Sequence, residues 1–521
     1  MQELDRTTPG ATELPTLTSF DPATGEVLGT VPIMGPEQVG AAVALAREAF
    51  PAWRDLGFEG RRRKLLALRD TLVRHKDDVA RLYTRENGKP LAEAMTSVLA
   101  CCDFLAYYAK HAAGLLADEP IHVSNPLQKN HETFLTYEAK GVVAVISPWN
   151  YPLLLAMAEI SAALAAGNAV VLKPSELTPL LGVKLGELAR EAGLPAGIFA
   201  VVTGDGRTGA ALTAAPVDRV CFTGSVATGT KVGQAAMAHL VPVTLELGGK
   251  DPALVLPDAD LDFAAQGLVW GAFTNAGQVC ASVERAYVHQ RIAEPLIAKV
   301  VERAKALVVG NGLDPKTEVG PLINQPALER IEAQVADAVA KGARVLTGGQ
   351  RLPGPGTFYP PTVLVDVTPD MLVMQDETFG PLLPIISVPD EAAMLAAAND
   401  SPFGLSATIW TADLDAGKRL ARQIQAGSVW INTGLASYGN PLTPRGGYKE
   451  SGIGKIGGRH GLLEMVNAKL VDVAVHGKPK LWWYPTWPAM VDFVSAGVDV
   501  MHGSSIGQRL SGLGKFLKSR R

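Results

Sequence analysis

The stretch "GVVAVISPWNYPLLLAMAEISAALAAGNAVVLKPSE", residues 141–176, decides the fold. It begins and ends with short β-rich runs, "GVVAVIS" and "NAVVLK", and the apolar segment between them is of helix length. Residues 153–172 come nearest to a membrane span, but Glu159 interrupts them, and Gly167 with Asn168 divides them into a helix-length and a strand-length piece. We therefore predict a buried helix followed by a buried strand.

The same alternation continues to residue 249. Further β-rich runs appear at "FAVVTG", "VCFTG" and "VTLELGG", and "LLGVKLGELAREAG" has a helical pattern. Strands that are apolar on both faces and joined by helices indicate a parallel sheet covered on both sides. The predicted fold class is therefore α/β, with a doubly wound cofactor-binding domain whose ligands bind at the carboxyl ends of the strands.

The flanking sequence predicts a second α/β domain and a small β extension. Residues 38–117 are mostly helical in pattern, and another mixed α/β unit runs from about 250 to 430. The isolated run "HETFLTYEA", residues 131–139, is typical of an edge strand that pairs with a partner subunit. The predicted domains are 1–122 with 141–248 as the first α/β domain, 249–435 as the second, 123–140 with 463–476 as the strands of the extension, and 477–521 as a C-terminal amphipathic extension.

Composition excludes several classes of protein. The chain has 521 residues, 47% hydrophobic and 19% charged, with a net charge of −4, which argues against nucleic acid as a partner. Its four cysteines are too few for a disulfide scaffold, and adjacent Cys101 and Cys102 do not have the spacing of a metal site, so we expect no metal. The first ten residues, "MQELDRTTPG", lack the apolar core of a signal peptide. A reducing, cytoplasmic setting is expected.

Two glycine motifs follow β-rich runs. "GDGRTG", residues 204–209, matches a dinucleotide fingerprint, but it follows the third strand and lacks an acidic residue about 20 positions on, so we interpret it as a strand-to-helix turn. "FTGSVATGTK", residues 222–231, leaves a β-rich run and opens a helix. There Gly224 and Gly229 would let backbone N–H groups approach an anion.

Cys280 lies in "NAGQVCASVER", residues 275–285, a polar stretch that looks like a loop followed by the start of a helix. Other unusual polar residues also follow strands, among them Asn150, Lys173 and Glu176, and Glu246 lies inside an apolar strand where an unpaired carboxylate is unfavourable. Each alone is consistent with a solvated or capping residue. All of them lie at strand or loop ends, where α/β proteins build their sites, which indicates a shared function.

Seven motifs together resemble the aldehyde dehydrogenase superfamily. They are "PWNYP", "LKPSE", "FTGS", "LELGGK", "GQVC", "ETFGP" and "GGYKESGIG", in that family's order and with its separations. The resemblance runs from about residue 19 to residue 473. It implies that residues 1–122 with 141–248 bind NAD, that 249–435 form a catalytic α/β domain, and that 123–140 with 463–476 are oligomerisation strands of a homodimer or homotetramer.

The resemblance also implies a mechanism. The Cys280 thiolate attacks the aldehyde carbon, and the Asn150 side-chain amide with the Cys280 backbone N–H binds the resulting oxyanion. After hydride transfer to the nicotinamide, Glu246 activates the water that hydrolyses the thioester. Burial in an apolar strand should raise the pKa of Glu246 towards the useful range.

The resemblance assigns NAD as the cofactor, with NADP possible but weaker. Lys173 and Glu176 would hold the adenine ribose, and the Glu176 carboxylate should repel a 2′-phosphate, an effect that Lys173 partly offsets. Glu377 would hold the nicotinamide ribose, and Phe379 would pack against the nicotinamide end. The full set of predicted cofactor contacts is Ile146, Ser147, Pro148, Trp149, Lys173, Glu176, Gly224, Ser225, Gly229, Glu377 and Phe379.

Four residues, Tyr151, Leu155, Val279 and Ala281, are expected to face the aldehyde channel by analogy. This apolar set favours aliphatic or aromatic aldehydes, and the alternative is a semialdehyde. The chain departs from the family at Arg445, where phenylalanine is usual, at Met465, where an aromatic is usual, and in a longer loop over 431–444. If Arg445 points inward, it could reverse the preference.

Alternatives from other classes fit less well. A CoA-acylating relative would not need the hydrolytic carboxylate of Glu246, and a catalytically inactive scaffold would not need to keep Cys280, Glu246 and Asn150. A cysteine hydrolase would need a histidine partner, and His289, the nearest in sequence, is expected at the surface.

The tail, residues 477–521, continues past the resemblance. It begins with the aromatic-rich "GKPKLWWYPTWPAM" and ends with "IGQRLSGLGKFLKSRR", in which Ile506, Leu510, Leu513 and Leu517 share one helical face. This pattern is typical of a membrane-surface helix, and equally of an arm that packs on a neighbouring subunit, which is the interpretation we favour. Aspartates and prolines within the tail exclude a membrane span.

Overall fold

The computed structural model describes residues 14–122, 131–475, 483–484 and 488–519. The stretch 141–176 forms β5 (Val142–Ile146), α5 (Pro152–Ala166) and β6 (Ala169–Lys173). Every residue of these three elements is buried, and Gly167 ends α5 in the left-handed region with φ of 105°. The predicted buried helix and buried strand are confirmed, and within the described residues no helix combines the length and hydropathy needed to cross a bilayer.

The first large sheet has six strands in the order β19-β9-β8-β5-β6-β7. Its strands pair in parallel, apart from β19, which pairs antiparallel with β9. Because the chain runs from β5 outward to β7 and then returns to β8 on the other side of β5, the strand order reverses between β5 and β8. Ligands of doubly wound sheets bind at such a reversal. The remaining strands are β7 (Phe199–Val201), β8 (Arg219–Thr223), β9 (Val243–Glu246) and β19 (Gly452–Ile453).

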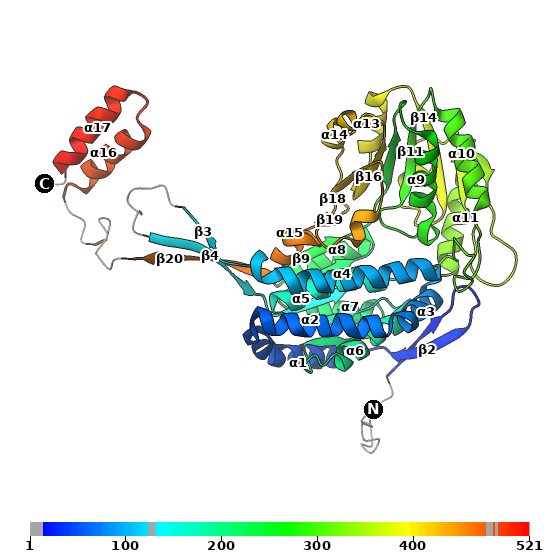
Figure 1. The fold of residues 1–521 in the computed structure, drawn as a ribbon, viewed down its shortest axis with the longest axis horizontal. Coiled ribbons are helices and arrows are strands. Elements are labelled where there is room, and N and C mark those ends of the chain that lie inside the picture. The colour runs from blue at the N-terminus through cyan, green and yellow to red at the C-terminus, as the bar shows by residue number, and fades with distance from the viewer. Residues whose placement is uncertain (1–13, 123–130, 476–482, 485–487, 520–521) are drawn as a thin grey trace, which may run out of the picture. The chain divides into compact units, whose positions relative to one another are not determined.

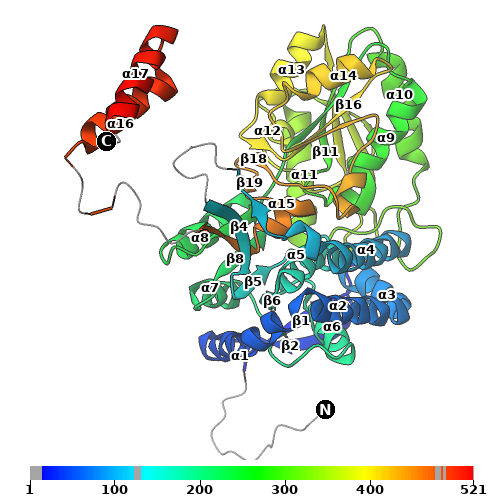
Figure 2. The ribbon, with the colours of Figure 1, turned by 60° about the vertical axis from the view of Figure 1, so that its left-hand side comes forward.

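Helices cover both faces of this sheet (Figures 1 and 2). On one face α5 and α6 (Pro179–Glu191) pack against α2 (Gly57–Arg74), and α4 (Leu91–Leu115) lies on α5. On the other face α1 (Pro36–Asp55), α7 (Gly206–Ala214) and α8 (Val226–Met237) follow one another. Asp205 caps the start of α7 by accepting from the Arg207 N–H, so "GDGRTG" is the predicted strand-to-helix turn.

The second large sheet lies entirely within residues 251–431 and has seven strands in the order β12-β13-β14-β11-β10-β16-β17. Only β12 pairs antiparallel in it. The strands are β10 (Asp251–Val255), β11 (Val283–His289), β12 (Arg344–Thr347), β13 (Thr362–Val365), β14 (Leu382–Val388), β16 (Ser406–Trp410) and β17 (Ser428–Ile431). The accompanying helices include α9 (Leu261–Phe273), α10 (Ala293–Ala306), α11 (Gln325–Ala340), α13 (Glu391–Asn399) and α14 (Leu414–Ala421).

Both large sheets belong to one compact unit, with α3 (Lys76–Asn87), the hairpin of β1 (Thr16–Phe20) and β2 (Val27–Pro32), and α15 (Gly458–Leu463). A second unit comprises the described residues of 118–136 and 469–521. The smaller sheet has the order β20-β4-β3, from β20 (Val466–Ala474), β4 (His131–Ala139) and β3 (Glu119–Pro120). Strands are thus present in the predicted extension, while residues 123–130 of that prediction lie outside the described residues.

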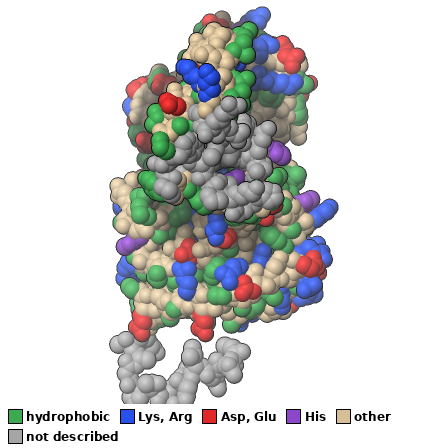
Figure 3. Space-filling view, turned by 90° about the vertical axis from the view of Figure 1, so that its left-hand side faces the viewer, with side chains coloured by type: hydrophobic (Ala, Val, Ile, Leu, Met, Phe, Trp, Pro, Cys, Tyr) green, Lys and Arg blue, Asp and Glu red, His purple; other side chains and the backbone are tan. Residues whose placement is uncertain are grey.

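The tail contains two helices, α16 (Met490–His502) and α17 (Ile506–Ser519). The predicted helix over residues 506–517 is confirmed. Over the face of the molecule shown in Figure 3, Lys and Arg side chains alternate with Asp and Glu side chains without a large patch of one sign.

Candidate active site

Cys280 follows a strained turn between α9 and β11. The short helix η2 (Thr274–Gly277) has positive φ at Asn275 (50°) and Ala276 (55°), values that side-chain-bearing residues rarely adopt. Both carboxylate oxygens of Glu93, from α4, accept a hydrogen bond from the Asn275 backbone N–H, at 3.2 and 3.0 Å. The sequence suggested a helix start after Cys280; instead β11 begins at Val283, so that prediction is wrong.

The structure brings Cys280, Glu246 and Asn150 together. Glu246 is the last residue of β9, and its Oε1 accepts from the Cys280 Sγ–H at 3.6 Å. Asn150 follows β5, and its Nδ2 donates to the Gln278 carbonyl at 3.1 Å, in the loop that carries the thiol. Glu246 is only 1% exposed and Asn150 only 3%, whereas Cys280 is partly exposed.

Burial controls the protonation of these groups. It raises the pKa of the Cys280 thiol well above its usual range, and the neighbouring Glu246 carboxylate raises it further, while Arg445 lowers it. Burial also raises the pKa of Glu246, against the opposing effect of the Arg445 guanidinium and of hydrogen bonds from Cys280 and Thr223. At neutral pH the thiol is therefore protonated in the protein alone.

The backbone of Asn150 is fixed from three sides. Its carbonyl accepts from Lys89 Nζ at 2.9 Å, from Asn275 Nδ2 at 3.2 Å and from the Tyr83 hydroxyl at 3.5 Å. Lys89 is 1% exposed, and its Nζ lies 3.6 Å from the centre of the Tyr151 ring. Burial lowers the pKa of Lys89 to about 7, although Glu93 opposes the shift. This network holds the side chain of Asn150 toward the Cys280 loop.

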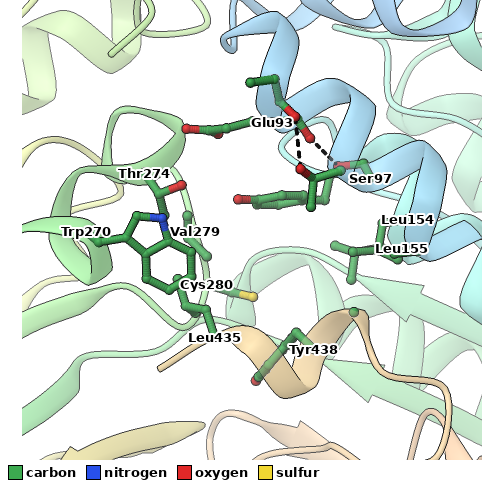
Figure 4. A pocket seen from close by; sticks show the side chains of 15 residues that line it. Glu93, Ser97, Leu154, Leu155, Trp270, Thr274, Val279, Cys280, Leu435 and Tyr438 are labelled. Atoms are coloured by element: carbon green, nitrogen blue, oxygen red, sulfur yellow. Dashed lines mark hydrogen bonds between the residues drawn. The ribbon is translucent and has the colours of Figure 1, made fainter. Parts of the chain in front are cut away.

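An apolar cavity of ≈ 510 Å³ opens onto Cys280 from one side. The sulfur points into it between side chains of α4, α5, α9 and the loop before β18 (Tyr448–Lys449) (Figure 4). Of the predicted channel residues, Tyr151, Leu155 and Val279 line this cavity. Among its lining residues only Glu93 is charged. The others are Ala92, Thr96, Ser97, Ala100, Leu154, Trp270, Thr274, Leu435, Tyr438 and Gly439.

A second cavity, of ≈ 190 Å³, reaches Cys280 from the other side. Six predicted cofactor residues line it: Pro148, Trp149, Gly224, Ser225, Glu377 and Phe379. The rings of Trp149 and Phe379 pack edge to face with centroids 5.3 Å apart, and Phe379 has a positive φ of 53°. Burial raises the pKa of Glu377 to about 7. Ser225 begins α8 as its N-cap, so the positive end of that helix faces this cavity.

The remaining predicted cofactor residues lie nearby. Lys173 ends β6, and its Nζ is 3.2 Å from Glu176 Oε2. Glu176 lines a further cavity of ≈ 400 Å³ together with Asn324 and Gln325. Ile146 ends β5, and the next residue, Ser147, has a buried hydroxyl without a hydrogen-bond partner.

Two predicted residues serve packing instead. The N–H of Gly229 donates to the Ser225 carbonyl inside α8, and a Cβ there would lie 2.3 Å from Leu247, so Gly229 allows close packing of helix and strand and does not face an anion. Ala281 packs with Leu405 and Trp430 and is absent from the cavity lining.

Two further expectations need correction or completion. His289 is buried at the end of β11, where its Nδ1 accepts from the Arg291 N–H, and not at the surface as predicted. Arg445 is 2% exposed, does not line the cavity, and donates from Nη1 to the Tyr438 carbonyl at 2.9 Å. Its Nε and Nη2 have no hydrogen-bond partner.

The sequence missed most of the wall of the apolar cavity. Glu93 and Tyr438 lie far from Cys280 in the chain, Trp270 lies ten positions before it, and none of the three belongs to a motif that the sequence analysis identified. It also missed Thr223, Leu247, Gly248 and Arg330 of the second cavity. Three of these residues, Thr223, Leu247 and Gly248, belong to or adjoin quoted motifs. Their position at the ends of strands could therefore have indicated that they line the cavity.

Comparisons with known proteins agree with this geometry. A family model described as "Aldehyde dehydrogenase family" matches residues 10–471. Glutarate-semialdehyde dehydrogenase of Pseudomonas aeruginosa is 40% identical over 452 residues, which cover 86% of this chain and 92% of that protein. Succinate-semialdehyde dehydrogenase [NADP(+)] of Escherichia coli is 39% identical over 458 residues, 87% of this chain and 94% of that protein. The crystal structure of an NAD-dependent aldehyde dehydrogenase from Sinorhizobium meliloti superposes with a TM-score of 0.86 at 38% identity, covering 90% of this chain and 93% of that one.

Proposed function

This chain belongs to the aldehyde dehydrogenase family, and from that premise we propose that it oxidises uncharged, apolar aldehydes to carboxylic acids, with Cys280 as the nucleophile. The observation that carries the assignment of Cys280 is its position between two cavities. The apolar cavity would admit the aldehyde, and the second cavity would hold the hydride acceptor. A carbon bonded to Sγ would then be accessible from both.

In the acylation half of the reaction, Cys280 must lose its proton before it attacks. The Glu246 carboxylate, 3.6 Å from Sγ, is the nearest base. The thiolate forms a carbon–sulfur bond to the aldehyde carbon, and the carbonyl oxygen becomes an oxyanion. Asn150 Nδ2 and the Cys280 backbone N–H would donate to that oxyanion, and each such donor is worth about 2.7–4 kcal/mol. Collapse of the oxyanion expels hydride and leaves a thioester on Cys280.

In the second half, water must attack the thioester. Glu246, once it has released the proton of the thiol to solvent, would take a proton from that water, and its raised pKa makes it a better base than an exposed carboxylate. The carbon–sulfur bond then breaks, which frees the carboxylic acid and restores Cys280. A CoA-acylating enzyme would instead pass the acyl group to a thiol, for which a buried carboxylate beside the thioester has no use. The presence of Glu246 next to Cys280 therefore favours hydrolysis.

The residues around the second cavity fit a nicotinamide dinucleotide. When bound, such a cofactor accepts the hydride. The edge-to-face pair of Trp149 and Phe379 offers an aromatic contact, Glu377 offers a hydroxyl acceptor, and the N-terminus of α8 offers positive potential to the pyrophosphate. Lys173 and Glu176 would hold the adenine ribose, and we propose a preference for NAD over NADP because the Glu176 carboxylate disfavours a 2′-phosphate.

The apolar cavity supports the proposed substrate class. The carboxylate of a semialdehyde needs a cation or several hydrogen-bond donors when it leaves water. The one charged lining residue, Glu93, carries the wrong sign for that purpose. Arg445 is buried outside the lining. A second candidate substrate class, the dicarboxylic semialdehydes, is favoured by the names of the relatives from Pseudomonas aeruginosa and Escherichia coli.

A substrate panel tests this proposal. We expect kcat/KM for hexanal and benzaldehyde to exceed that for succinic and glutaric semialdehyde. Leu154→Arg would add a cation to the cavity wall and should shift the preference toward the semialdehydes, whereas the uncharged control Leu154→Gln should not. Higher kcat/KM for a semialdehyde in the unaltered enzyme would establish the second candidate.

A further inference from the structure

The two tail helices form an antiparallel hairpin. Phe493, near the start of α16, packs against Phe516, near the end of α17, with ring centroids 4.5 Å apart. Asp499 Oδ2 lies 3.8 Å from Lys515 Nζ, between the same two helices. Phe493 and Ala496 are buried against α17. One apolar stripe of each helix is thus covered by the other helix.

Each helix also has a second apolar stripe that is exposed. In α16 it consists of Val491, Val494, Val498 and Met501, and in α17 of Ile506, Leu510, Leu513 and Leu517. The eight side chains are between 44% and 79% exposed. Their spacings of three and four residues place each set on one helical face.

The two exposed stripes lie on the same side of the hairpin. Residues of an α-helix turn by about 100° each, so the exposed stripe lies about 150° onward from the mean direction of Phe493 and Ala496 in α16 and about 90° onward from Phe516 in α17, in the same sense. Because the helices run antiparallel, rotations of the same sense from the contact line bring both stripes to one side. The result is a continuous outer face of aliphatic side chains, which we call the outer face.

The charge of the tail differs from that of the rest of the chain. Residues 477–521 contain seven Lys and Arg but only two Asp, a net charge of +5 in a chain whose total is −4. Just before the hairpin, Trp483 and Tyr484 are also exposed. Aliphatic area, positive charge and adjoining aromatic residues are the combination by which helices bind the surface of an anionic bilayer.

We propose that the outer face of the α16–α17 hairpin docks on an anionic lipid bilayer, with both helices in the plane of the surface. This proposal replaces the subunit-docked arm that the sequence alone favoured. The helices have 13 and 14 residues and so span about 20 Å each, too short to cross the hydrocarbon core. The outer face holds no aromatic or arginine anchor of the kind that dominates protein interfaces. A lipid surface requires only apolar area and positive charge. This inference does not rest on the proposed substrate.

Vesicle sedimentation of the full-length protein tests the proposal. We expect binding to mixed phosphatidylcholine–phosphatidylglycerol vesicles, weaker binding to pure phosphatidylcholine vesicles, and loss of binding as salt is raised. Leu510→Gln with Leu517→Gln should weaken binding at least tenfold, because both side chains leave the outer face. Ser511→Gln, an exposed polar position on the same helix, is the matched control and should bind normally. Lys518→Gln should weaken binding about fivefold.

Three results would overturn the proposal. The first is that the full-length protein does not bind anionic vesicles. The second is a doubly substituted outer face that binds as well as the unaltered protein. The third is a change in the number of subunits of the Leu510→Gln, Leu517→Gln variant, measured by light scattering, while its vesicle binding stays the same. That result would identify the hairpin as an arm docked on a neighbouring subunit. Far-ultraviolet circular dichroism, which depends on no substrate, serves to show that each variant is folded.

Discussion

Replacing Glu246 with glutamine should lower the pKa of the Cys280 thiol. The carboxylate lies 3.6 Å from Sγ, and its negative charge opposes the formation of a second negative charge on sulfur. Glutamine has nearly the same shape but no charge. The substitution therefore removes the repulsion while leaving the cavity and the burial of the thiol in place.

The size of the effect follows from the distance. Two unit charges 3.6 Å apart interact by about 1 kcal/mol in water and by about 5 kcal/mol at an effective dielectric constant of 20. At 1.36 kcal/mol per pKa unit, the pKa of Cys280 should fall by between about one and three units. This lowering of the Cys280 pKa operates only at pH values above the pKa of Glu246, because a protonated Glu246 carries no charge and does not repel the thiolate. Burial raises that pKa, so the two enzymes should converge in acid.

The rate of alkylation of Cys280 by iodoacetamide, measured against pH without cofactor, reports this pKa directly. We expect the midpoint of the unaltered protein to lie above pH 9, and that of Glu246→Gln to lie lower. Glu159→Gln is the matched control, since Glu159 is another buried carboxylate but is not among the main groups that raise the pKa of Cys280. An unchanged or raised midpoint in Glu246→Gln would refute the reasoning.

Further predictions concern the remaining steps. Glu246→Gln should also release up to one equivalent of NADH and then stall at the thioester; unimpaired steady turnover would show that another group activates the water. Asn150→Ala should lower kcat by a factor of about 10²–10³ with little change in KM, because one donor to the oxyanion is lost; a pure KM effect would contradict that role. Glu176→Gln should raise kcat/KM for NADP relative to NAD, and an unchanged ratio would remove Glu176 from the ribose site. Arg445→Met should move both limbs of the pH profile of kcat/KM to higher pH, because the guanidinium lowers the pKa of both Glu246 and Cys280; a profile that stays in place would show that this charge is screened.

The fold could be predicted from the sequence because the residue patterns that indicate its strands and helices lie within short stretches of the chain. Strand 142–146 is apolar at every position and strand 169–173 at every position but its last, Lys173, a pattern that a doubly covered parallel sheet explains. Glycine at 167 ends the helix between them where the chain needs a positive φ. The same reasoning failed after Cys280, where "ASVER" has no clear period and proved to lead into a strand.

The site could be predicted only where its residues sit in motifs. Val279 and Ala281 flank the nucleophile symmetrically in sequence, yet only Val279 lines the apolar cavity. A turn closed by the Ser282 N–H on the Val279 carbonyl directs Ala281 toward Leu405 and Trp430 instead. The types of residue in the loop do not indicate such a turn. The prediction for Gly229 is ambiguous for a related reason, since a glycine permits close packing as well as anion binding.

The chemistry and the substrate depend on different parts of the chain, which explains why one could be inferred from sequence and the other could not. Glu246 ends a strand, Asn150 follows one and Cys280 lies just before one, and their geometry is fixed by contacts such as that of Lys89 with the Asn150 carbonyl. The aldehyde cavity is walled instead by one face of α4 and by the loop that carries Tyr438. Apart from Glu93, its residues are uncharged, as in most packed helices, and 182 positions separate Glu93 from Asn275, whose backbone N–H donates to it. Relatives can therefore share the motifs and the reaction while their cavities select different aldehydes.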